Sequence, residues 1–188
     1  MDIIKKAFEN IHREDFVPEY LRSQVSIDAP LPIGFSQTIS QPYTVRLMLE
    51  WLNAQAGEKI LDVGSGSGWT TALLSQIVGP KGKIFAVEKI PELVKFGRNN
   101  CKNIGVKNAK FFQAGQEYGL TSHSPYDRIL VSASAKKLPK ELLTQLKIGG
   151  KLVIPVQNDI LEITKTSEHN FDTITHPGFI FVPLVQNV

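Results

Sequence analysis

Ile60-Leu61-Asp62-Val63-Gly64-Ser65-Gly66-Ser67-Gly68-Trp69 is the stretch of sequence that decides the fold. Its first four residues are typical of a buried strand, and three glycines follow at alternate positions. Residues 70–78 then carry apolar side chains at helical spacing. Glycine adopts positive φ and lets a ligand lie against bare backbone, while a helix start offers unpaired N–H groups. The stretch therefore predicts a nucleotide-binding strand, turn and helix. The alternative is a glycine turn that only tightens a strand–helix unit.

The spacing of the glycines favours one class of nucleotide cofactor over another. A dinucleotide fingerprint reads G-x-G-x-x-G, whereas the glycines here stand at 64, 66 and 68. Asp62, just before the first glycine, suits a cationic ligand better than a pyrophosphate. Glu88 ends the next predicted strand, where it can accept hydrogen bonds from both ribose hydroxyls of an adenosine, whichever cofactor carries it. Together these residues predict S-adenosylmethionine as the cofactor, with S-adenosylhomocysteine as its product, and disfavour a nicotinamide dehydrogenase.

The composition fits one globular domain. Of the 188 residues 42% are hydrophobic and 21% charged, which is ordinary for such a domain. The net charge of +3, with no basic run among aromatics, argues against a nucleic-acid partner. Cys101 is the only cysteine, and no two of the four histidines have metal-ligand spacing, so we expect no metal. No signal peptide or membrane span is evident. We therefore expect a cytoplasmic monomer that binds no membrane.

Short apolar runs alternate with helical patterns along most of the chain. Because these runs are continuously apolar, they predict a parallel sheet covered on both faces. The resulting fold class is α/β, a Rossmann-like, doubly wound, mostly parallel sheet with antiparallel C-terminal edge strands. We expect a single domain over 1–188, in which residues 1–53, with N-terminal helices and an active-site loop, pack on a cofactor-binding core at 54–188. Strands are predicted at 60–63, 84–87, 109–113, 127–132, 161–165, 171–175 and 179–184, and helices at 3–12, 43–52, 70–78, 91–104 and 139–146, the last leading into a Gly149-Gly150 turn.

The segment 26–42 contains several prolines and a glycine, and it carries apolar residues that need somewhere to pack. A long loop in a compact domain is usually functional or disordered, and this segment is too apolar for disorder. It is therefore a candidate active-site loop. Ser40 lies at its end, before Pro42 in the first turn of a predicted helix, so a helix cap is the alternative interpretation of Ser40.

These features resemble the protein-L-isoaspartate O-methyltransferase family of class I S-adenosylmethionine-dependent methyltransferases, over nearly the whole chain. The run Gln37-Thr38-Ile39-Ser40-Gln41-Pro42 is the most specific match, within the similar segment 31–43. The run Leu61-Asp62-Val63-Gly64-Ser65-Gly66-Ser67-Gly68 is similar to the cofactor motif, which many methyltransferases share. Further similar segments are 16–19, 125–127, 145–156 and 181–184.

The resemblance implies methyl transfer to the free carboxylate of an L-isoaspartyl residue in a damaged protein. The ester then collapses to a succinimide, which opens a route to repair. A carboxyl with a pKa of about 4 is already ionised at neutral pH, so alignment and loss of water suffice without a general base. By the resemblance Ser40 is the catalytic residue, and Thr38, Ile39, Ser40 and Tyr43 bind the substrate. The expected cofactor-binding residues are Asp62, Gly64, Ser65, Gly66, Gly68, Glu88, Lys89, Gly115 and Gln116.

The sequence departs from the family after the third predicted strand. Family members usually carry Gly-Asp-Gly there, and this chain has Ala114-Gly115-Gln116. Gln116 is a candidate hydrogen-bonding partner for the adenine, and Glu117 is a candidate replacement for the missing carboxylate. Two alternatives follow, namely a methyltransferase with another acceptor and a family member that binds the cofactor without turnover.

Overall fold

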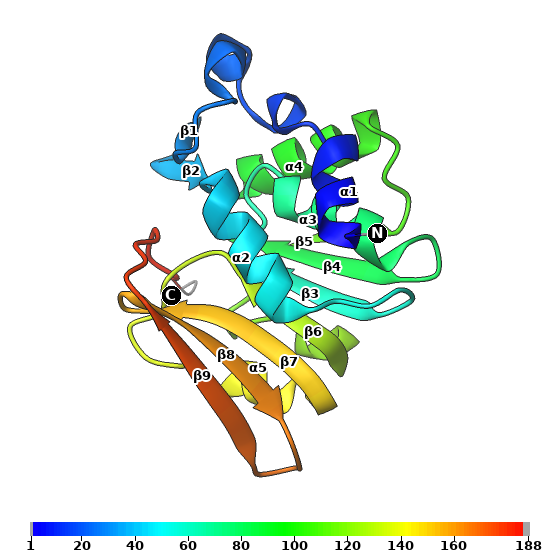
Figure 1. Ribbon diagram of the computed structural model, residues 1–188, viewed down its shortest axis with the longest axis vertical. Coiled ribbons are helices and arrows are strands. Elements are labelled where there is room, and N and C mark those ends of the chain that lie inside the picture. The colour runs from blue at the N-terminus through cyan, green and yellow to red at the C-terminus, as the bar shows by residue number, and fades with distance from the viewer. Residues whose placement is uncertain (1, 186–188) are drawn as a thin grey trace.

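The computed structural model describes residues 2–185 and contains a seven-stranded sheet in the order β5-β4-β3-β6-β7-β8-β9 (Figure 1). The strands from β5 to β7 are parallel, and β8 and β9 are antiparallel at one edge. This arrangement confirms the predicted fold class and edge strands. The strands are β3 (Lys59–Val63), β4 (Lys83–Glu88), β5 (Ala109–Gln113), β6 (Tyr126–Val131), β7 (Leu146–Val156), β8 (Asp159–Lys165) and β9 (Phe171–Pro177).

Two hydrophobic cores lie on the two faces of the sheet. Ile60 of β3 belongs to the core that contains the N-terminal helices, and the next residue, Leu61, belongs to the core that contains Leu142. Both β3 side chains are fully buried, because successive strand residues point to opposite faces and both faces are covered. The helices are α1 (Ile3–Asn10), α2 (Pro42–Leu52), α3 (Trp69–Val78), α4 (Pro91–Asn103) and α5 (Lys140–Thr144), with short 3₁₀ helices η1 (Arg13–Phe16), η2 (Glu19–Gln24) and η3 (Thr121–His123).

The predicted active-site loop is ordered and contains a small β-hairpin. Strand β1 (Leu31–Gly34) pairs antiparallel with β2 (Gln37–Ile39), and the apolar side chains of Leu31, Ile33 and Ile39 are buried in the same core as α3. The apolar residues of the predicted loop therefore pack as expected, while the two hairpin strands within it were not predicted. The interpretation of 1–53 as a layer on the 54–188 core stays a prediction, and the shared core fits it.

Two features of the C-terminal part differ from the expectation. Residues 179–184 form no strand. Instead Ser134 N donates to Val182 O and Leu184 N donates to Ser134 O, both at 2.8 Å, which anchors this segment at the end of β6. Gly149 and Gly150 do not form the predicted turn but lie inside β7, where the pairing with β6 shifts register. A Cβ on Gly150 would lie 2.8 Å from Lys147 O, so glycine permits this bulge.

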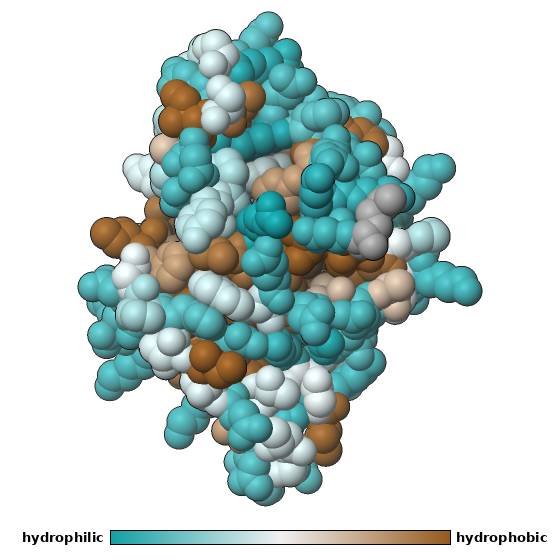
Figure 2. Space-filling model, viewed as in Figure 1, coloured by the Kyte–Doolittle hydropathy of each residue, from teal (hydrophilic) through white to brown (hydrophobic). Residues whose placement is uncertain are grey.

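The surface on the face shown in Figure 1 is mostly hydrophilic, with apolar residues gathered in separate patches (Figure 2). From residue 2 to residue 185, no helix is both long and apolar enough to cross a membrane.

Candidate active site

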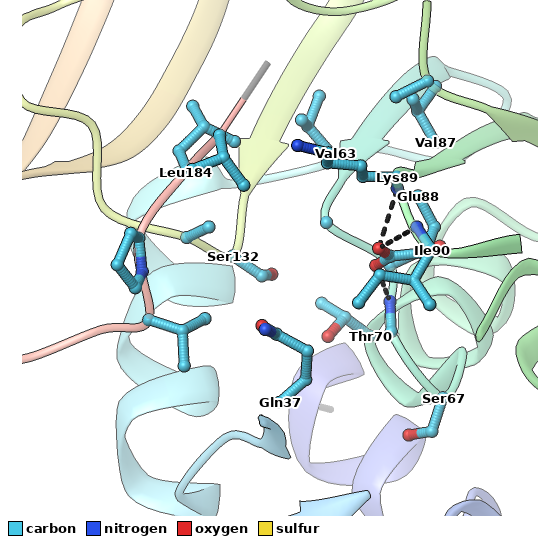
Figure 3. A pocket seen from close by; sticks show the side chains of 18 of the residues that line it. Gln37, Val63, Ser67, Thr70, Val87, Glu88, Lys89, Ile90, Ser132 and Leu184 are labelled. Carbon is cyan, nitrogen blue, oxygen red and sulfur yellow. Dashed lines mark hydrogen bonds between the residues drawn. The ribbon is translucent and has the colours of Figure 1, made fainter. Parts of the chain in front are cut away.

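A cleft lies at the carboxyl ends of the parallel strands, beside the point where the strand order reverses between β3 and β6 (Figure 3). Ligands of open α/β sheets bind at this place because the loops that follow the strands diverge there. The β1–β2 hairpin closes one side of the cleft, and residues 182–185 close another. The loops after β3, β4, β5 and β6 supply the remaining wall.

The glycines after β3 have two different structural roles. Gly64 and Gly66 line the cleft, and Gly66 has a φ of +51°. Gly68 does not line the cleft but faces α4, where an added Cβ would lie 2.8 Å from Gly97 O. Bare backbone at Gly64 and Gly66 therefore faces the cavity, whereas Gly68 lets α3 and α4 approach each other.

Glu88 lines the cleft at the end of β4, and its carboxylate is held rigidly. Glu88 Oε2 accepts from Gly66 N at 2.9 Å, and Oε1 accepts from Lys89 N at 2.7 Å and Ile90 N at 3.0 Å (Figure 3). A carboxylate has about four lone-pair sites, so these three bonds leave capacity for a ligand hydroxyl. The geometry suits the recognition of a ribose.

The structure does not bring Asp62 to the wall of the cleft. Its side chain is fully buried, and Oδ2 accepts from Thr71 Oγ1 of α3 at 2.6 Å. Oδ1 has no hydrogen-bond partner among the described residues. Burial, with a smaller contribution from the charge of Glu88, raises the pKa of Asp62 to about 7, although the hydrogen bond from Thr71 lowers it in part. Any effect of Asp62 on a ligand must therefore pass through the glycine loop or through its charge.

Ser40 lies where the cleft meets an adjoining groove. Both cavities are lined by Thr38, Ser40, Ser132 and Val182. The other groove residues are Pro30, Gln41, Thr44, Ile180 and Phe181.

The alternative interpretation of Ser40 as a helix cap was wrong. The N-cap residue of α2 is Gln41, and its side chain makes no capping hydrogen bond. Asp28 Oδ1 instead accepts from Tyr43 N in the first turn at 2.9 Å. Ser40 is thus positioned beside the cleft without serving the helix.

The remaining predicted residues divide between the cleft and its surroundings. Ile39, Ser65, Lys89 and Gly115 line the cleft together with Thr38, Ser40, Gly64, Gly66 and Glu88. Tyr43, which is 58% exposed, lines neither the cleft nor the groove, and Gln116 is exposed outside both. Glu117 does line the cleft, and its carboxylate accepts from Thr121 Oγ1 at 2.9 Å.

Sequence reasoning missed Trp69 and Gln37, which both line the cleft. The indole N–H of Trp69 and the hydroxyl of Ser65 are buried without hydrogen-bond partners among the described residues. Buried polar groups are normally satisfied, so these two atoms, beside bare glycine backbone, fit a site built for a polar ligand. The position of Trp69 directly after the glycine run was the available signal.

The described residues that line the cleft supply hydroxyls, the carboxylates of Glu88 and Glu117 and the ammonium group of Lys89. Over residues 2–185, no cluster of three or more His, Cys, Asp or Glu side chains is placed to hold a metal ion. The arrangement can therefore hold a nucleoside and orient a second group beside it.

Comparison with protein families agrees with this geometry. The family model described as protein-L-isoaspartate(D-aspartate) O-methyltransferase matches residues 1–188. The protein-L-isoaspartate O-methyltransferase of Methanopyrus kandleri is 42% identical over 187 residues, which cover 97% of this chain and 83% of the relative. That of Pyrococcus horikoshii is 41% identical over 187 residues, with 97% and 84% covered.

Solved structures with the same description have the same fold. A protein-L-isoaspartate O-methyltransferase superposes with a TM-score of 0.91 and 29% identity, and the match covers all of this chain and 62% of that one. A Plasmodium falciparum protein described as a protein-L-isoaspartate O-methyltransferase, solved in complex with S-adenosyl-L-homocysteine, has a TM-score of 0.88 and 26% identity, with 100% and 92% covered.

Proposed function

The chain belongs to the protein-L-isoaspartate(D-aspartate) O-methyltransferase family, and we propose that the cleft described above is where it performs the family's reaction. In that reaction a methyl group passes from S-adenosylmethionine to the free carboxylate of an L-isoaspartyl residue in a damaged protein or peptide. The product S-adenosylhomocysteine is the ligand named in the Plasmodium falciparum structure.

The carboxylate of Glu88 and the bare glycine backbone of the cleft support the cofactor-binding role that we propose for it. Glu88 would hold the ribose hydroxyls, and the backbone at Gly64 and Gly66 would lie against the rest of the ligand. The unpartnered polar atoms of Ser65 and Trp69 would complete hydrogen bonds with the polar end of the donor. When bound, the cofactor supplies an electrophilic methyl group on a sulfonium.

One observation supports the acceptor side most directly, namely that Ser40 lines both the cleft and the adjoining groove. A polypeptide in the groove can therefore direct a carboxylate past the Ser40 hydroxyl into the cleft. The hydroxyl can donate a hydrogen bond to one carboxylate oxygen and so orient the other toward the methyl group. Ser132, which also lines both cavities, offers a second hydroxyl there.

This chemistry requires positioning more than proton transfer. The acceptor carboxylate is ionised at neutral pH, so its proton need not be removed. The hairpin and residues 182–185 line two sides of the cleft and would limit the access of water to that carboxylate. We extend the proposal to isoaspartyl proteins and peptides as substrates, and the monomeric state and cytoplasmic location stay predictions.

The test is a methyl-transfer assay with radiolabelled S-adenosylmethionine and two peptides that differ only in an isoaspartyl or a normal aspartyl linkage. We expect transfer to the isoaspartyl peptide alone. Equal transfer to both peptides would indicate a different acceptor specificity. Transfer to neither, with S-adenosylhomocysteine still bound in calorimetry, would support a family member without turnover.

A further inference from the structure

Arg13 is a buried arginine whose hydrogen bonds all go to backbone carbonyl groups. It lies in η1, its exposure is 7%, and it lines neither the cleft nor the groove. Its acceptors belong to the segment before the hairpin and to Ser40, the residue that follows it. Arg13 Nη1 donates to Val25 O at 3.2 Å and Ile27 O at 3.1 Å, and Nη2 donates to Ala29 O at 2.7 Å and Ser40 O at 3.1 Å.

No carboxylate within residues 2–185 forms an ion pair with Arg13. A buried cation is costly unless polar groups replace its water. Here four carbonyl groups and the nearby charge of Asp28 do so in part, whereas Arg13 Nε is buried without a hydrogen-bond partner among the described residues. The side chain is 12 to 27 residues away from these acceptors in sequence. A single guanidinium thus holds the segment before the hairpin and the backbone of Ser40 in one fixed arrangement.

The same guanidinium also contacts the cofactor side of the cleft. Arg13 Cζ lies 5.5 Å from the centre of the Trp69 ring, a cation–π distance, and Trp69 lines the cleft directly after the glycine loop. Asp28 holds the residues that follow Ser40 in the sequence, since it accepts from Gln41 Nε2 at 3.0 Å and from Tyr43 N at 2.9 Å. The Ser40 backbone is therefore held at its own carbonyl by Arg13 and at the following residues by Asp28.

We propose that Arg13 is a positioning residue for methyl transfer. It fixes the side of the cleft that carries Ser40 (the Ser40 wall) relative to the side that carries Trp69 (the Trp69 wall). The inference rests on the proposed function, because the two walls would carry the acceptor and the donor. In-line transfer needs the two reacting atoms in near-contact alignment, and a misplacement of about 1 Å costs a rate factor of about a hundredfold. Arg13 touches neither reactant, but it can affect the rate by setting the distance between the two walls that hold them.

The test compares Arg13→Ala and Arg13→Lys with Arg128→Ala as the matched control. Arg128 is also a poorly exposed arginine with an unpartnered buried Nε, and it pairs with Glu58 at 3.1 Å. It lies near the start of β6, at the end of the sheet away from the cleft. The measurements are kcat and KM with the isoaspartyl peptide, the affinity for S-adenosylhomocysteine, the melting temperature, and hydrogen exchange of residues 25–43.

For Arg13→Ala we expect kcat to fall about a hundredfold while the affinity for S-adenosylhomocysteine changes less than about threefold. Exchange over 25–43 should accelerate, and added ethylguanidinium should restore part of kcat. Arg13→Lys keeps the charge but cannot reach four carbonyls, so its kcat should fall about tenfold. Arg128→Ala should lose melting temperature but keep kcat and the exchange of 25–43.

The proposal is overturned if Arg13→Ala keeps kcat within about threefold of the unmodified chain, since the expected loss is far larger. It is equally overturned if the loss follows the melting temperature as in Arg128→Ala, with no rescue by ethylguanidinium. If Arg13→Ala does not fold, Arg13→Lys decides by the same measurements. Absence of transfer by the unmodified chain would instead contradict the proposed function, and exchange over 25–43 would still report on Arg13.

Discussion

Replacing Asp62 by asparagine should make the protein more stable at neutral pH and not at acidic pH. The carboxyl is fully buried beneath α3, and burial raises its pKa from 3.8 to about 7. Between these pH values the folded state keeps the proton that the unfolded state has lost. The stability that this group contributes is therefore complete below about pH 4 and declines as the pH rises to about 7.

The size of the effect follows from the difference in pKa. A pKa that is higher by about 3 in the folded state corresponds to about 4 kcal/mol, at about 1.4 kcal/mol for each tenfold change in the proton equilibrium. Asparagine has no proton to lose and can still accept from the Thr71 hydroxyl. Its amide leaves a buried donor unpaired, at a cost of about 1–3 kcal/mol that does not depend on pH. The difference between variant and unmodified chain should thus move by about 4 kcal/mol in favour of asparagine from pH 4 to pH 8.

Urea unfolding at constant ionic strength, at several pH values from 2 to 8, measures this difference. Asp127→Asn is the matched control with the opposite sign. Burial alone would raise the pKa of Asp127, but the hydrogen bonds from Lys147 Nζ and Lys59 N outweigh it and lower that pKa. Asp127 therefore contributes stability at neutral pH that is lost in acid. Asp127→Asn should have a lower free energy of unfolding than the unmodified chain at pH 7 and the same free energy of unfolding in strong acid. A stability difference for Asp62→Asn that stays constant with pH would refute the reasoning.

The remaining predictions concern the cleft. Ser40→Ala should lower kcat about 10- to 100-fold in the peptide assay, the value of one hydrogen bond to a charged group, with the affinity for S-adenosylhomocysteine unchanged; kcat as high as in the control Ser26→Ala would remove Ser40 from the mechanism. Gly66→Val should abolish binding of S-adenosylhomocysteine in calorimetry, because the valine side chain would occupy the side of the cleft where the ligand lies against bare backbone, between Gly66 and Ile33. Gly57→Val, which has a similar positive φ and nothing within 4 Å, should bind normally, and equal loss in both would point to backbone strain. Gly115→Asp should tighten that binding about tenfold, since the position is open and the family carboxylate is absent; unchanged affinity would mean that Glu117 already supplies the charge.

Most of the sheet could be predicted because its strands are buried on both faces. The apolar run at 84–87 marks all but the ends of β4, whose residues from 84 to 88 are all buried. The predicted bounds 109–113 also match β5, although this strand lies at the edge of the sheet and only Phe111 in it is buried. The hairpin could not be predicted in the same way. Its strands span only 31–34 and 37–39. Buried and exposed residues alternate in the first, but four residues that include a proline and a glycine are too few to identify a strand.

The apolar run at 179–184 was misread for a related reason. Apolar residues indicate burial, but they do not say whether a sheet or a ligand cleft provides it. Here the run lies beside the cleft and the groove, and its backbone is held by Ser134 instead of a neighbouring strand. Composition alone cannot separate these two outcomes.

The candidate site was predicted in part. Alternate residues of a strand point to the same face, so Asp62 shares the face of Ile60, which the helices cover. This alternation could have shown that the Asp62 side chain does not point toward a ligand beyond the end of the strand. Arg13 carries no local signal, because its partners are carbonyl groups 12 to 27 residues away. Such contacts depend on tertiary structure and not on any sequence spacing.

A crystal structure with bound S-adenosylhomocysteine tests the central claim most directly. We predict that the ribose hydroxyls donate to Glu88 and that the sulfur faces the junction of cleft and groove, beside Ser40. A ligand bound elsewhere, or a sulfur that points away from Ser40, would contradict the account.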